Sequence, residues 1–145
     1  KSICTSDSNM SRSRLRNRVT SADALGWCTL NKYDLRFHKV SKDDSGKCDA
    51  YFTSDASDVI YGVLFKIDPS EKLALDRAEG LGYGIDENLK PYSWYVNHVL
   101  VGAREAFLPA DYIQLKISSV EAVEDSDKER DSKQRAIHSY QGQAL

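Results

Sequence analysis

The chain reads Val59-Ile60-Tyr61-Gly62-Val63-Leu64-Phe65-Lys66-Ile67 and continues as Asp68-Pro69-Ser70-Glu71-Lys72-Leu73-Ala74-Leu75-Asp76-Arg77-Ala78-Glu79-Gly80. The first nine residues are strongly apolar and rich in β-branched and aromatic side chains, which predicts a strand. Asp68 can cap a helix, Pro69 suits its first turn, and Glu71 completes a capping box. The stretch therefore predicts a strand followed at once by a short helix.

Glu79 lies at the end of this helix where an acidic residue is least favoured. Gly80 supplies a left-handed stop, so Glu79 falls in the last turn, where the helix dipole favours Lys or Arg. An exposed carboxylate there costs roughly 0.3–1 kcal/mol. From the residues alone, Glu79 is either a solvated helix-end carboxylate or an acid that is kept for its chemistry.

A second distinctive segment lies near the N-terminus, where Ser8-Asn9-Met10 precedes Ser11-Arg12-Ser13-Arg14-Leu15. Together with Leu75 to Gly80, it resembles the γ-glutamylcyclotransferase family. That family carries a Tyr-Gly-Ser-Asn-Met/Leu loop after its first strand and, much later, a Leu-Asp-x-x-Glu-Gly segment whose Glu is the catalytic acid/base. The likeness runs from about Ile3 to about Val123. It includes Val63-Leu64-Phe65, Lys90-Pro91-Tyr92-Ser93-Trp94-Tyr95, and Gly102-Ala103-Arg104-Glu105 followed by Leu108-Pro109.

The resemblance implies a cofactor-free enzyme whose small-molecule substrate is a γ-glutamyl compound. Family members convert a γ-glutamyl amide or peptide into 5-oxoproline and release an amine or amino acid, because the substrate's α-amine attacks its own γ-carbonyl. Proximity in such a ring closure is worth about 7–11 kcal/mol. One carboxylate can take the proton and return it, and by resemblance that catalytic group is Glu79. The implied substrate-binding residues are Ile3, Cys4, Thr5, Ser6, Asp7, Ser8 and Asn9 in the loop, with Tyr95 as a side wall and Tyr83 close after the glutamate.

The sequence departs from the family pattern in two places. Ser6-Asp7 stands where the family has Tyr-Gly, which removes an aromatic wall and easy access to positive φ, and adds a negative charge. Either an Asx-type turn preserves the loop with different chemistry, or catalysis is damaged. After Gly84 the family's further strand pair is missing. It is deleted, or residues are absent from the numbering; the second is favoured because losing core strands would exceed a reserve of about 5–15 kcal/mol.

Composition predicts a single cytoplasmic domain. The 145 residues (16.3 kDa) carry a formal charge of −2, so no global field attracts nucleic acid or anionic lipid. No apolar run approaches the roughly 18 residues of a membrane span, and the N-terminal residues lack the apolar core of a signal peptide. The odd, widely spaced cysteines (Cys4, Cys28, Cys48) predict reduced thiols rather than a disulfide framework. The three histidines (His38, His98, His138) have no metal-ligand spacing with them, so we expect no metal.

The predicted fold class is α+β, with a small curved mixed sheet or barrel of about five to seven strands and flanking helices. Expected strands lie near Ile3 to Thr5, Leu25 to Leu30 and Asp34 to Val40, with a hairpin from Asp49 to Thr53 and Asp58 to Ile67. Expected helices run from about Ser11 to Arg18, from Pro91 to about Phe107, and from Pro109. In the long one, Trp94, Tyr95, Val99 and Gly102 recur at helical spacing and should face a core. We expect residues 1–123 to form the domain and residues 124–145 a charged helical extension, in a monomer or weak homodimer.

The residues give weaker support to other functions. The arginines at every second position (Arg12, Arg14, Arg16, Arg18) form no single stripe on a helix, so a solvated helix is favoured over a phosphate-binding face. An ordinary amide hydrolase lacks an evident Ser or Cys nucleophile beside a histidine. Without the resemblance, the residues favour Tyr95 as a core tyrosine whose hydroxyl is satisfied nearby. The serious alternative is a catalytically impaired relative that binds a γ-glutamyl ligand or a protein, which the altered Ser6-Asp7 loop motivates.

Overall fold

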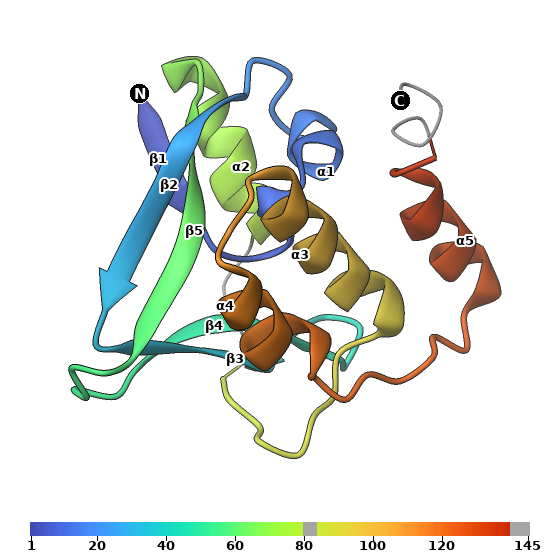
Figure 1. Ribbon diagram of the computed structural model, residues 1–145. Helices are drawn as coiled ribbons and strands as arrows, with labels where there is room; N and C mark the ends of the chain where they lie inside the picture. Colours follow the sequence, from blue (N-terminus) through green and yellow to red (C-terminus); the bar gives the residue numbers. More distant parts are fainter. Residues whose placement is uncertain (80–83, 140–145) are drawn as a thin grey trace.

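The computed structural model describes residues 1–79 and 84–139, with only the backbone of Ala78 and Glu79. It confirms the α+β class (Figure 1). The strands are β1 (Ser2–Thr5), β2 (Asp23–Asn31), β3 (Tyr33–Val40), β4 (Gly46–Phe52) and β5 (Val59–Lys66). The helices are α1 (Arg12–Arg16), α2 (Lys72–Glu79), α3 (Ser93–Glu105), α4 (Ala110–Ile113) and α5 (Lys128–Ala136), with short turns η1 (Ser8–Met10), η2 (Pro69–Glu71) and η3 (Gln114–Ser118).

The strands form a three-stranded sheet in the order β1-β5-β2 and a two-stranded sheet of β3 and β4. The two sheets are halves of one long bent hairpin, because β2 pairs antiparallel with β5 and β3 pairs antiparallel with β4. The bend lies at Lys32, which has a φ of 69°. Its carbonyl accepts a hydrogen bond from the amide of Thr53, and its own amide donates to the carbonyl of Asp58. The segment between β4 and β5 is therefore a corner of the sheet.

The expected hairpin of β4 with β5 is accordingly wrong. The connecting turn is Ser41 to Gly46, where the Asp43 carboxylate accepts hydrogen bonds from Ser41, Ser45 and Lys47. The chain reverses there, so β4 returns along β3 and only then bends toward β5. The sheet is not closed into a barrel. Where the family pattern has a further strand pair, the described residues contain one isolated bridge, between Lys39 and Ile85.

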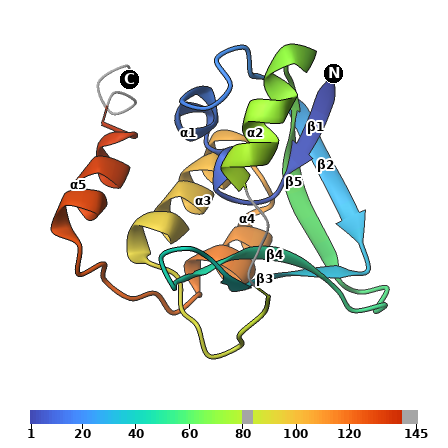
Figure 2. The same ribbon diagram turned by 180° about the vertical axis from the view of Figure 1, so that it is seen from behind.

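Helix α3 forms the centre of the core. Its expected inward residues are all buried, namely Trp94, Tyr95, Val99 and Gly102. The first three lie with Val63 and Phe65 of β5 and Leu15 of α1 in one apolar cluster. The helices gather on one side of the three-stranded sheet, and α5 lies farthest from that sheet (Figures 1 and 2). Within the residues described, no helix is both long and apolar enough to cross a membrane.

The expectation of reduced thiols is wrong for two of the three cysteines. Cys4 of β1 and Cys28 of β2 form a disulfide, with their Cα atoms 6.1 Å apart. The two strands flank β5 in the same sheet, and this neighbourhood cannot be seen in the spacing of the cysteines along the chain. Cys48 is free and buried, and burial raises the pKa of its thiol.

Candidate functional site

The loop after β1 is held against the middle of the molecule by a close contact with α3. Its turn η1 is fully buried at Ser8, Asn9 and Met10. Gly102 makes this possible, because a Cβ on that residue would lie 2.3 Å from the Met10 carbonyl carbon. Farther along α3, a Glu105 carboxylate oxygen accepts a hydrogen bond from the Arg12 amide at 3.1 Å. The segment Gly102 to Glu105 therefore supports the loop and the start of α1.

Two arginines hold the other side of the loop. Arg14 Nε donates to Ser8 Oγ at 2.9 Å, and Arg18 Nη1 donates to Asn9 Oδ1 at 3.0 Å. Arg14 is buried, so the expectation of a solvated arginine helix is wrong for this residue. Burial, followed by the charge of Arg18, lowers the pKa of Arg14 to about 10. These contacts were not predicted from the sequence, because α1 is only one turn long and packs under the loop.

Asp7 forms an Asx-type turn at the start of η1. Its Oδ1 accepts hydrogen bonds from the Asn9 amide and from Thr5 Oγ1, both at 2.8 Å. Its φ of −106° is ordinary for any residue, so replacing the family's glycine causes no backbone strain here. The loop shape is thus kept by different chemistry. The Asn9 amide that Asp7 engages is also the kind of donor that stabilises an oxyanion.

The remaining loop residues lie at the end of β1. Ile3 is half-buried and packs against the core. Cys4 is exposed and its sulfur is committed to the disulfide. Thr5 is buried, whereas Ser6 is half-buried. Ile3 and Cys4 therefore serve the sheet, and the segment from Thr5 to Asn9 forms the loop proper.

Tyr95 is enclosed in the core, 4% exposed, on the inner face of α3. Its hydroxyl accepts a hydrogen bond from the Cys48 amide at 3.1 Å, and its ring meets Phe37 edge to face. Burial, with the nearby Cys48 and Asp7, raises the pKa of the hydroxyl well above its ordinary value. Tyr95 thus ties β4 to α3 close to the loop.

Of the predicted site residues Glu79 and Tyr83, the structure describes only the backbone of Glu79. Glu79 ends α2, but its side chain lies outside the described residues, and so does the whole of Tyr83. Asp68 caps the helical segment as expected, accepting from the Ser70 amide at 2.9 Å. In Figures 1 and 2, α2 runs toward the loop that follows β1.

A hydrogen-bonded chain links the loop to the C-terminal helix. Arg14 Nη1 donates to Gln134 Oε1 at 2.8 Å, and the same oxygen lies 2.9 Å from His98 Nε2. His98 Nδ1 lies 2.5 Å from His138 Nε2. Because Gln134 offers an oxygen, His98 carries its proton on Nε2 and His138 donates to Nδ1. Burial, followed by Arg14, lowers the pKa of His98 to about 3.

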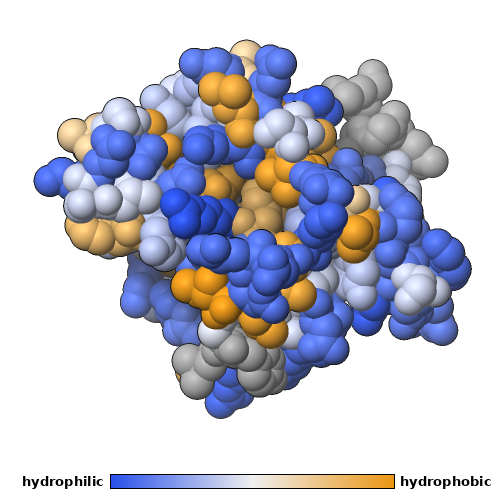
Figure 3. Space-filling model, turned by 90° about the horizontal axis from the view of Figure 1, so that it is seen from below, coloured by the Kyte–Doolittle hydropathy of each residue, from blue (hydrophilic) through white to orange (hydrophobic). Residues whose placement is uncertain are grey.

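A further hollow lies on a different face. A cleft of about 770 Å³ lies between β3 and residues 87–91, and none of the described loop residues lines it. Figure 3 shows a hollow on this face with apolar atoms at its base and hydrophilic residues around it. His38 lines the cleft and pairs with Asp49 at 2.9 Å. Among the described residues, no group of His, Cys, Asp and Glu side chains could hold a metal.

Comparison with solved structures gives the chain the γ-glutamyl cyclotransferase-like fold. A structure described as "Gamma-glutamyl cyclotransferase" matches with a TM-score of 0.75 and 20% identity, over 93% of this chain and 98% of that one. An uncharacterized protein from Homo sapiens matches with 0.76 and 19%, over 92% and 97%. YkqA from Bacillus subtilis matches with 0.66 and 17%, over 84% and 55%. The resemblance inferred from the sequence motifs is confirmed at the level of the fold.

Neither protein-family profiles nor curated protein sequences match this chain.

Proposed function

We propose that the protein is a γ-glutamylcyclotransferase-type enzyme that closes a γ-glutamyl amide or peptide to 5-oxoproline and releases the amine or amino acid. One observation carries the proposal. The motif residues Ser8 to Met10 of the loop are buried and held by α1 and α3, in a chain whose fold matches a γ-glutamyl cyclotransferase over 93% of its length. A cytoplasmic location and a place in glutathione metabolism belong to the same proposal.

In the proposed mechanism Glu79 takes a proton from the substrate's α-ammonium group. The resulting amine attacks the γ-carbonyl carbon, and the ring closes through a tetrahedral intermediate. Glu79 then returns the proton to the departing nitrogen as the carbon–nitrogen bond breaks. The ring nitrogen gives up its second proton, which the released amine takes to become an ammonium ion, so water is not consumed. Main-chain amides of the loop face the developing oxyanion. Tyr95, together with Tyr83, borders the glutamyl group in this proposal.

A specific observation favours a second candidate, an impaired relative that binds a γ-glutamyl ligand without turning it over. Asp7 engages the Asn9 amide within the loop and adds a negative charge there. Both effects oppose a developing oxyanion. In this candidate, the Asn9 amide donates to Asp7 instead of to the substrate's carbonyl oxygen. The ligand can then bind, but its oxyanion is not stabilised and no turnover follows.

The test is release of 5-oxoproline from γ-glutamyl-alanine and related amides by the purified protein. Glu79→Gln should lower the rate by roughly 10²–10⁴-fold while the circular dichroism spectrum stays unchanged. Asp76→Asn on the same helix is the matched control, because it removes an exposed carboxylate that pairs with Lys72. Equal loss in both variants, or no change on replacing Glu79, contradicts the assignment of the proton shuttle.

Restoring the family residues at Ser6-Asp7 as Tyr-Gly separates the two candidates. A large gain in turnover would identify the loop as the weakened part of an enzyme. If neither form turns over any γ-glutamyl amide or peptide, calorimetric binding of the same compounds would instead support the binder.

A further inference from the structure

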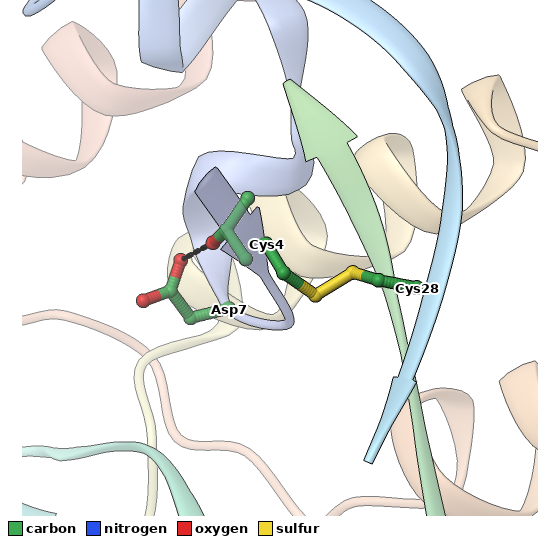
Figure 4. The surroundings of a disulfide bond; sticks show 4 residues. Cys4, Asp7 and Cys28 are labelled. Carbon is green, nitrogen blue, oxygen red and sulfur yellow. Dashed lines mark hydrogen bonds between the residues drawn. A yellow bond between two sulfur atoms is a disulfide. The ribbon is translucent and has the colours of Figure 1, made fainter. Parts of the chain in front are cut away.

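The disulfide spans the central strand of the sheet at a glycine. Thr5 lies opposite Val63, and Cys28 lies opposite Gly62. A Cβ on Gly62 would lie 2.6 Å from the Thr5 carbonyl oxygen and 3.2 Å from Cys28 Sγ. The end of β1 therefore folds over β5 at Gly62, and the sulfur bridge fastens it to β2 on the other side. Figure 4 shows the bridge running from β1 to β2.

The bridge is one residue away from the hydrogen bonds that shape the loop. Thr5 follows Cys4 directly, and its hydroxyl donates to Asp7 Oδ1. That oxygen also accepts from the Asn9 amide. Figure 4 shows Asp7 and its hydrogen bond close to the cysteine pair. The position of Cys4 therefore sets where the loop begins.

The sheet has other means of holding its strands. β1 has four paired positions along β5, and β2 has eight. The Lys1 carbonyl also accepts from the Ile67 amide at 2.8 Å. Beneath the sheet, Val63 and Phe65 are at most 2% exposed. Cleaving the sulfur bond thus leaves the strands paired, and the loop that follows Thr5 loses its covalent anchor while it keeps its contacts with Arg14 and Arg18.

The bridge is also open to reagents, because Cys4 is exposed and Cys28 is half-buried. In the cytoplasm, the location given under the proposed function, persistent disulfides are rare and those present are often catalytic or redox-sensing. An exposed bridge in that compartment is exposed to thiol exchange.

We propose that Cys4–Cys28 is a thiol–disulfide exchange site that controls the position of the loop Thr5 to Asn9. A thiolate of a dithiol reductant attacks Cys4 Sγ, the sulfur–sulfur bond breaks, and Cys28 leaves as a thiolate and takes a proton. The second thiol of the reductant attacks the mixed disulfide and releases Cys4. Two electrons and two protons pass to the protein, and the reductant becomes a disulfide. Oxidation by a disulfide reverses the sequence and fixes the loop.

The experiment compares the oxidised and reduced full chain by hydrogen exchange. Under native conditions a dithiol should free two alkylatable cysteines, Cys4 and Cys28, identified by peptide mass mapping. Exchange at the Asn9 and Met10 amides should rise roughly tenfold, whereas amides of β5 keep their protection. Cys28→Ser should reproduce the reduced behaviour without reductant. Cys48→Ser is the matched control, because it removes the buried thiol and should leave the oxidised and reduced patterns as they are.

Three results would overturn the inference: a chain that carries no bridge after air oxidation, loop exchange that is equal in both states, or loss of protection in β5 together with the loop. The last would make the bridge a purely structural bond.

Where the inference concerns activity, it rests on the proposed function, and turnover is measured in both redox states to separate the two. A loop whose exchange depends on redox state, without turnover in either state, would contradict only the proposed enzymatic function. Turnover that is equal in both states, with unchanged loop exchange, would contradict only the proposed redox control.

Discussion

The loop after β1 and the C-terminal helix α5 both pack against α3, but they are held by different forces. The loop is held by the backbone contact at Gly102, by a disulfide and by the charged donors Arg14 of α1 and Arg18 beyond its end. Helix α5 has no buried residue of its own and is attached through polar contacts. These are the chain of Gln134, His98 and His138 and the hydrogen bond from Arg135 to Ser93 of α3. Close packing is insensitive to pH but is disrupted by added side-chain volume. Contacts between titratable groups tolerate added volume but are disrupted when the pH changes. The two regions should therefore fail under different perturbations.

The largest effect is expected from volume added beneath the loop. Gly102→Ala places a methyl group against the Met10 backbone, which cannot move aside as a flexible side chain would. We expect a loss of about 2–3 kcal/mol in the free energy of unfolding, measured by urea denaturation, and greater exchange in η1. Arg104→Ala, on the exposed face of α3, is the control and should change stability little. A stable Gly102→Ala variant with an unaltered loop would mean that the contact does not hold it.

Acid should release α5 before it affects the loop. The folded pKa of His98 is about 3 and its ordinary value is 6.5, so in this interval the unfolded chain binds a proton that the folded chain does not. This stability is fully present above pH 6.5 and falls as the pH drops toward 3. From pH 7 to 5 the loss should be about 2 kcal/mol. The lowered pKa of His138 acts in the same direction.

The measurement is the free energy of unfolding against pH, with hydrogen exchange resolved for α5 and η1. Exchange in α5 should rise first, because protonated His98 would face Arg14 and Arg18. His98→Leu is expected to be less stable at pH 7 but to have a flatter pH profile. A profile as steep as that of the native chain would show that another group titrates.

A smaller coupling should connect the two regions through Arg14. Arg14 joins Ser8 to Gln134 with separate nitrogens, which a lysine cannot do. Arg14→Lys and Gln134→Leu should be non-additive in stability by about 0.5–2 kcal/mol in a double-mutant cycle. Arg14→Lys with Lys133→Ala serves as the reference cycle, since Lys133 is exposed and pairs with Glu129 within α5. If the stability effects of Arg14→Lys and Gln134→Leu are additive, the two regions are not energetically coupled through Arg14.

The sequence predicts those parts of the fold that depend on local pattern. Helical spacing identified Trp94, Tyr95 and Val99 as core residues, and all three are buried. The pairing of β4 with β3 escaped prediction because the left-handed corner at Lys32 has no glycine to mark it.

The candidate site was predicted less completely. A loop does follow β1, and Asp7 keeps its shape through an Asx-type turn, while its role in substrate binding stays a prediction. The support from Arg14 was missed because its partner Gln134 lies 120 residues away, beyond any local pattern. The cysteine bridge was missed for a related reason: Cys4 and Cys28 become neighbours only through the strand that separates them. The catalytic role of Glu79 stays a prediction.

The bent hairpin has a consequence for the order in which the chain assembles. Its turn at Ser41 to Gly46 is local, so β3 and β4 can pair early, and the pairing can extend past the corner to β2 and β5. β1 must wait for β5, whose residues lie about sixty positions later in the chain. During synthesis the first strand therefore docks among the last elements of the sheet. In a refolding experiment, formation of the Cys4–Cys28 bond can therefore report when the sheet is complete.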